Sequence, residues 1–70
     1  MGIILISGKL EKNIYNLLSE KKQISKTQVS VLLRSKTKAK SLMLQWLIYG
    51  LVTEDDYNIY FVEGVKVEKK

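Results

Sequence analysis

The chain has 70 residues, of which 46% are hydrophobic, and it carries a formal net charge of +5 without any histidine or cysteine. A chain this short forms one domain at most, and it buries only about 60% of the surface that its unfolded form exposes, so its stability margin is thin. The missing histidine and cysteine exclude disulfides and the usual zinc sites, and they leave general acid–base chemistry to carboxylates.

The positive charge is concentrated in the first 50 residues, which hold nine basic and two acidic side chains, whereas residues 51–70 hold three basic and five acidic ones. Between Lys21 and Lys40 there are seven basic residues and no acid. A one-sided cationic segment attracts polyanions and speeds their association. Nucleic acid is therefore a candidate partner, and the alternative is a well-solvated, lysine-rich surface.

The first apolar run, residues 3–6, is short and rich in β-branched side chains, which predicts a buried or paired strand. Ser7 and Gly8 break it. Residues 9–22 then show apolar side chains at helical spacing, which predicts a first helix with one apolar face. That face consists of Leu10, Ile14, Leu17 and Leu18.

Two further helices are predicted between residues 25 and 49. Residues 25–28, Ser-Lys-Thr-Gln, match a capping box, in which the serine oxygen accepts a hydrogen bond from the amide three residues later. They open a helix of about nine residues. Ser35 or Thr37 caps a third helix that runs to about Tyr49, and Gly50 ends it because glycine adopts the left-handed conformation readily. Ala39, Met43 and Trp46 share the inward face of this helix.

The last third of the chain predicts β-structure. Residues 51–54 and 57–62 are β-prone and flank Asp55 and Asp56, which favours a hairpin with a short polar turn. Residues 65–68 alternate between apolar and charged side chains and form either an edge strand or a tail.

This order of elements resembles the winged-helix family over roughly residues 9–62, and Ile24 to Val52 is similar to its helix-turn-helix core. The resemblance rests on a small polar residue that opens the second helix, apolar residues that recur along the third, and a terminal Gly-Leu-Val. These are Ser25, Ala39, Met43, Trp46 and Gly50-Leu51-Val52. It implies an α+β fold: a single domain, residues 1–70, with a three-helix winged helix-turn-helix core, a C-terminal β-hairpin wing, a short N-terminal strand (3–6) and a C-terminal strand or tail (65–70).

The resemblance also implies sequence-specific binding to double-stranded DNA, with the third helix, about 37–49, in the major groove of a small transcriptional regulator. The lysines would meet phosphates, while Thr37, Ser41 and Gln45 would read base edges. The full predicted set is Lys26, Thr27, Gln28, Arg34, Lys36, Thr37, Lys38, Lys40, Ser41 and Gln45. DNA would repel the acids at 54–56, so we expect them to shape the turn instead.

The chain also has more apolar side chains than one small core accommodates, and contiguous exposed apolar surface usually marks an interface. We therefore expect a homodimer, which would bind a palindromic site. Its predicted interface is Ile3, Ile4, Leu5, Ile6, Leu44, Ile48 and Tyr49. The alternative is that residues 3–6 pair beside the hairpin within one monomer.

The main alternative function is a winged-helix protein–protein interaction module, an adaptor or assembly factor with little DNA binding. Leu44 on the supposed reading face and the acidic wing favour it. We expect no enzymatic activity, metal, cofactor or small-molecule ligand. The longest near-apolar run, 42–52, is about half of the roughly 20 residues that a membrane span needs. We therefore expect a soluble, cytoplasmic protein, associated with the nucleoid through its binding to DNA. The Lys-, Ile- and Glu-rich composition without Cys or His resembles that of proteins from hyperthermophiles and their mobile elements, which favours a prokaryotic, viral or plasmid origin.

Overall fold

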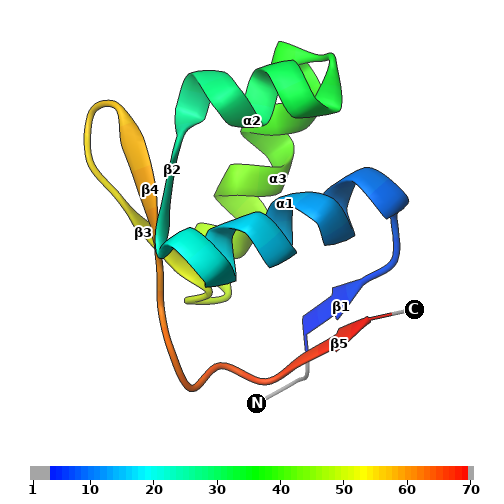
Figure 1. Ribbon diagram of the computed structural model, residues 1–70, viewed down its shortest axis with the longest axis vertical. Coiled ribbons are helices and arrows are strands. Elements are labelled where there is room, and N and C mark those ends of the chain that lie inside the picture. Colours follow the sequence, from blue (N-terminus) through cyan, green and yellow to red (C-terminus); the bar gives the residue numbers. More distant parts are fainter. Residues whose placement is uncertain (1–3, 70) are drawn as a thin grey trace.

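The computed structural model describes residues 4–69 and is an α+β arrangement of three helices and two small sheets (Figure 1). Ile3, which was predicted to lie in the first strand and in a dimer interface, lies outside the described residues. In chain order the elements are β1 (Ile4–Ile6), α1 (Lys9–Lys21), β2 (Gln23–Ser25), α2 (Lys26–Leu33), α3 (Lys36–Ile48), β3 (Val52–Glu54), β4 (Asn58–Phe61) and β5 (Val67–Lys69).

The helix boundaries follow local hydrogen bonds at the predicted caps. Ser25 Oγ accepts a hydrogen bond of 3.0 Å from the backbone N–H of Gln28, which confirms the predicted serine cap of α2. At the start of α3, Ser35 rather than Thr37 is the cap, and its Oγ accepts a bond of 3.2 Å from the N–H of Lys38. Both helices therefore begin at a serine whose side chain satisfies a free backbone amide.

The connections on either side of α3 depend on residues in the left-handed backbone conformation. Arg34, between α2 and α3, has φ of 57°, and Gly50 after α3 has φ of 76°. The N–H of Gly50 donates to the carbonyl of Leu47, and the N–H of Leu51 donates to that of Trp46. This pair of bonds is a Schellman motif, and it confirms Gly50 as the residue that ends the helix.

The predicted hairpin is present as β3 and β4, and it belongs to an antiparallel sheet with the strand order β2-β4-β3. β2 was not predicted. It pairs with β4 so that Ile24 lies opposite Ile59, and the N–H of Lys26 then donates to the carbonyl of Tyr57. The start of α2 is thereby held against the hairpin.

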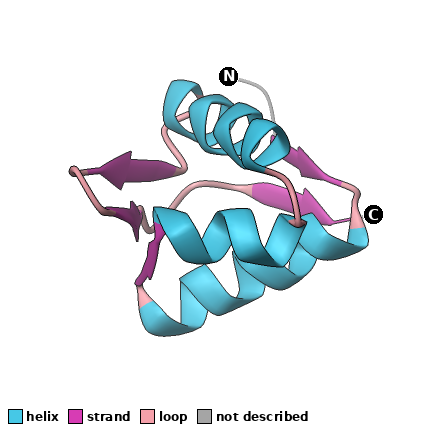
Figure 2. Ribbon diagram, turned by 90° about the horizontal axis from the view of Figure 1, so that it is seen from above, coloured by secondary structure: helices cyan, strands magenta, loops and turns pink. Residues whose placement is uncertain are grey.

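The N-terminal strand pairs elsewhere than beside the hairpin. β1 and β5 form a separate two-stranded parallel sheet in which Ile4 lies opposite Val67, and β2 takes the place next to β4. The alternative that residues 3–6 pair beside the hairpin is therefore wrong, and the C-terminal run contains a strand. Figures 1 and 2 show the two sheets at opposite ends of the helices.

The core lies between the helices and the inner face of the three-stranded sheet. Trp46 of α3 is only 2% exposed, and Tyr15 of α1 packs against it edge to face, with ring centroids 6.3 Å apart. Tyr15 also packs against Phe61, with centroids 5.9 Å apart. The buried residues are Ile6, Ile14, Leu18, Ile24, Val29, Leu33, Ala39, Trp46, Leu51, Val52 and Ile59.

Two predicted positions differ from the sequence-based expectation. Leu10 was assigned to the apolar face of the first helix, but it is 43% exposed because it lies in the first turn of α1, at the edge of the core. Ile6 was assigned to a dimer interface, but it is 2% exposed and belongs to the core of the monomer. Its side chain is therefore not available to a partner subunit.

Candidate nucleic-acid interface

The cationic segment of the sequence surrounds the start of α3. Arg34, Lys36, Lys38 and Lys40 are all exposed. Within residues 4–69 the structure contains two salt bridges, which use Lys22 and Lys26, so these four cations are free of acidic partners among the described residues. Four uncompensated positive charges within about two helical turns produce a strong local attraction for polyanions.

The outward face of α3 changes in character along the helix. Ala39 and Trp46 point into the core, and the opposite stripe follows helical spacing of four, three and four residues. The stripe consists of Thr37, Ser41, Leu44 and Ile48, all exposed. Its first half is therefore polar, as predicted for Thr37 and Ser41, and its second half is apolar, with Leu44 59% and Ile48 73% exposed.

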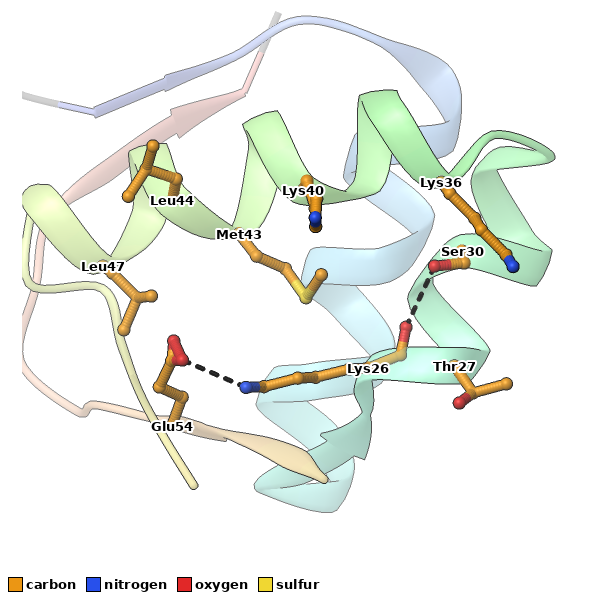
Figure 3. A pocket seen from close by; sticks show the side chains of 9 residues that line it. All are labelled: Lys26, Thr27, Ser30, Lys36, Lys40, Met43, Leu44, Leu47 and Glu54. Carbon is orange, nitrogen blue, oxygen red and sulfur yellow. Dashed lines mark hydrogen bonds and ion pairs between the residues drawn. The ribbon is translucent and has the colours of Figure 1, made fainter. Parts of the chain in front are cut away.

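One flank of α3 borders a groove with a volume of about 510 Å³ between α2, α3 and β3 (Figure 3). We call this hollow the α2–α3 groove. It is lined by Lys26, Thr27, Ser30, Lys36, Lys40, Met43, Leu44, Leu47 and Glu54. The groove brings together four of the predicted DNA-contacting residues, namely Lys26, Thr27, Lys36 and Lys40.

Gln45 lies on the other flank of α3. It lines a second hollow, of about 310 Å³, with Trp46, with Ser7 of the β1–α1 connection and with Glu11 in the first turn of α1. It is four residues after Ser41, so the two side chains are neighbours on the surface of α3, but Gln45 faces the second hollow rather than the α2–α3 groove. Lys38 is seven residues before Gln45, two helical turns away, so it lies on the same flank.

The lysine at the start of α2 is already paired. Lys26 Nζ lies 3.0 Å from Glu54 Oε1, and the two side chains are 30% and 40% exposed. Figure 3 shows the lysine side chain reaching across the groove from α2 to the carboxylate on β3. Glu54 was expected only to shape the turn, but its carboxylate neutralises Lys26, a predicted phosphate-contacting residue. No local sequence signal connects these residues, because the β2–β4 and β4–β3 pairings bring them together.

Asp55 shapes the turn of the hairpin, as predicted. Its Oδ1 accepts hydrogen bonds of 2.9 and 2.8 Å from the N–H groups of Tyr57 and Asn58, and the Tyr60 hydroxyl donates to Oδ2. The tyrosine bond and then the two amides hold the pKa of Asp55 below its ordinary value, and the same bond raises the pKa of Tyr60. The hairpin tip is therefore anionic at neutral pH.

The described residues offer little basis for a metal site. No group of three or more acidic side chains in residues 4–69 is arranged to hold a cation.

The second salt bridge of the described residues joins Lys22 and Glu63, with Nζ 2.7 Å from Oε1. The hydrogen bond and then the charge of Lys22 lower the pKa of Glu63. Lys22 Nζ also lies 5.0 Å from the centroid of the Phe61 ring, so this cation links the residue before β2 to the end of the central strand, β4.

Four of the nine residues that line the α2–α3 groove have no functional signal in the sequence. Ser30, Met43, Leu47 and Glu54 line it but were not predicted as site residues. Met43 and Leu47 were predicted to be core residues because they lie on the inward half of α3. They do pack against the core, but both are only partly buried, and their exposed part lines the groove.

Comparisons with known proteins add no family assignment. No protein-family model matches the chain, and neither a curated protein nor a solved structure matches it. None of the helices in residues 4–69 has the length and apolar character that crossing a bilayer demands.

Proposed function

We propose that the protein is a winged-helix DNA-binding protein that places the start of α3 in the major groove of a duplex. The order α1-β2-α2-α3-β3-β4, with the three strands in one antiparallel sheet, is compatible with the layout of that family. The hairpin β3–β4 takes the place of the wing. Regulation of transcription is the role that we infer for a domain of this kind.

The observation that carries the proposal is the group of unpaired cations around the N-terminus of α3, beside the polar half of its outward face. Lys36, Lys38 and Lys40 would neutralise phosphates, and Thr37 and Ser41 lie where a recognition helix presents side chains to base edges. The Ser25-capped start of α2 borders the same groove and would meet the DNA backbone.

The test is binding to a fluorescently labelled mixed-sequence duplex, followed by anisotropy as salt rises from about 50 to 200 mM. We expect binding that weakens steeply with salt. Replacing Lys36, Lys38 and Lys40 together with Ala should flatten the salt slope by about 0.9 for each lost phosphate contact. The control variant replaces Lys9, Lys21 and Lys66, which are also exposed, and so makes the same change in net charge away from the groove.

An equal loss of slope in both triple variants would mean that net charge alone attracts DNA, and it would contradict the proposed interface. An absence of binding even at low salt would contradict the proposed function.

The apolar half of the outward face favours two further proposals. We infer a homodimer in which Leu44, Ile48 and Tyr49 (59, 73 and 56% exposed) pack against a second copy, because such a cluster on a small domain usually marks an interface. The second candidate function is a protein interaction module, and Leu44 and Ile48 support it because their side chains have no polar group with which to recognise phosphates or most base edges.

A further inference from the structure

We propose that the α2–α3 groove binds an acidic amphipathic helix of a partner protein. This inference gives the second candidate function a partner of defined chemistry, and it does not require that the protein binds DNA. It rests on the combination of an apolar floor and a cationic rim in one hollow.

The floor of the groove is apolar and belongs to α3. Met43 and Leu47 are half-buried and Leu44 is 59% exposed, and they follow one another along the flank of the helix. Figure 3 shows the Met43 side chain pointing into the space between α3 and α2. A methionine in such a place adapts to ligands of different shape. Nucleic acid offers little to this floor except thymine methyl groups, whereas leucine or phenylalanine side chains would bury against it.

The rim of the groove carries three lysines, Lys26, Lys36 and Lys40, and a single acid, Glu54. Because Glu54 is paired with Lys26, the uncompensated charge lies at Lys36 and Lys40, on the α3 side. A ligand with complementary electrostatics therefore carries carboxylates along the edge that meets α3. An amphipathic helix with apolar residues at i, i+3 or i+4 and i+7 and acids beside them supplies both features.

The size of the groove fits this kind of ligand. A volume of about 510 Å³ has room for about two or three large apolar side chains. An amphipathic helix that binds in a groove usually inserts a few anchor side chains of this kind. Because Lys36 and Lys40 also belong to the proposed DNA surface, an acidic helix in the groove would compete with a duplex for the same cations. Occupation of the groove by a partner would thereby release the protein from DNA.

The probe for the test is a fluorescein-labelled 16-residue peptide with leucines on one helical face and glutamates beside them. A scrambled peptide of the same composition is its control. We expect saturable binding of the amphipathic peptide and at least about ten-fold weaker binding of the scrambled one, because only the former places its apolar side chains together.

Variants of exposed residues locate the site without threatening the fold. Leu44→Gln should weaken peptide binding about ten-fold, whereas Val31→Gln, at an exposed apolar residue of α2 that does not line the groove, should leave it unchanged. Lys40→Gln should weaken it and Lys38→Gln should not. Leu44→Gln should keep the salt-dependent DNA binding, because that depends on the cations, so the two proposals can fail separately.

Three outcomes would overturn the inference. Equal affinity for the amphipathic and scrambled peptides would mean that charge alone attracts them. Equal losses in Leu44→Gln and Val31→Gln would place the site elsewhere. A dimer in light scattering that Leu44→Gln and Ile48→Gln both dissociate, together with no peptide binding, would mean that a second copy of the chain covers this part of α3.

Discussion

The salt bridge between Lys26 and Glu54 gives a sharp test of the DNA-binding proposal. Lys26 is predicted to contact a phosphate, but its ammonium group is already paired with the carboxylate of Glu54. Glu54→Gln removes the negative charge and keeps a side chain of nearly the same shape. The substitution frees Lys26 Nζ to meet a phosphate at the start of α2. We therefore expect the variant to bind duplex DNA more tightly than the wild-type protein.

The magnitude follows from one added phosphate contact. Each contact changes the slope of log K against log salt by about 0.9, which corresponds to roughly eight-fold tighter binding at about 0.1 M salt. The cost to the fold is small, because both side chains are partly exposed and such pairs stabilise a protein by about 0.2–1 kcal/mol. Glu54→Gln should therefore raise affinity without a large change in the free energy of unfolding.

The assay is the salt titration of a labelled duplex by anisotropy, with urea unfolding of each variant measured in parallel. Asp56→Asn is the matched control, since Asp56 is exposed, lies in the same hairpin and takes part in neither salt bridge of the described residues. It makes the same change in net charge without freeing a lysine. If the two variants show the same affinity and salt slope, Lys26 does not meet a phosphate and the reasoning fails.

Three further predictions concern the fold and assembly. Trp46→Ala should lower the free energy of unfolding by about 3–5 kcal/mol in urea titrations, because the buried indole fills the core; stability near that of the wild type would mean that Trp46 does not pack there. Because the folded-state pKa of Asp55 is lowered, its contribution to stability is present above the ordinary carboxyl pKa of about 4 and is lost as pH falls through the folded value. Thermal unfolding between pH 2 and 7 should thus show a steeper acid loss for the wild type than for Asp55→Asn, and parallel curves would contradict this. Light scattering at micromolar concentration should give twice the chain mass of 8.1 kDa, and Ile48→Gln should restore the monomer; a wild-type monomer would end the dimer proposal.

The helices and the hairpin were predictable because their signals are local. The serines at 25 and 35, the glycine at 50 and the apolar spacing of α1 and α3 each act within a few residues, and the structure places helix ends within one or two residues of the prediction. Asp55 was predictable for the same reason, since its side chain bonds to amides two and three residues later.

What the sequence could not reveal depends on pairing across the chain. β2 has only three residues, Gln23–Ser25, and its strand character comes from the β4 edge rather than from its own propensity. The Lys26–Glu54 pair and the α2–α3 groove depend in turn on that strand. The cations of the candidate interface were predictable from composition, but which flank of α3 borders the α2–α3 groove, and that Gln45 faces the second hollow, required the rotation of α3 about its axis, which the core fixes.

The parallel pairing of β1 with β5 has a consequence for the order of folding. It joins residues 63 positions apart, Ile4 and Val67, whereas the helices and the hairpin form within much shorter stretches. Closing a loop of that length costs about 4 kcal/mol in chain entropy. Pairing of β1 with β5 therefore becomes favourable only after the helices have formed and brought the two strands close together. We therefore expect β1 and β5 to pair last during folding and to separate first during unfolding. Amide hydrogens of these two strands should exchange through a local opening that leaves the helices intact.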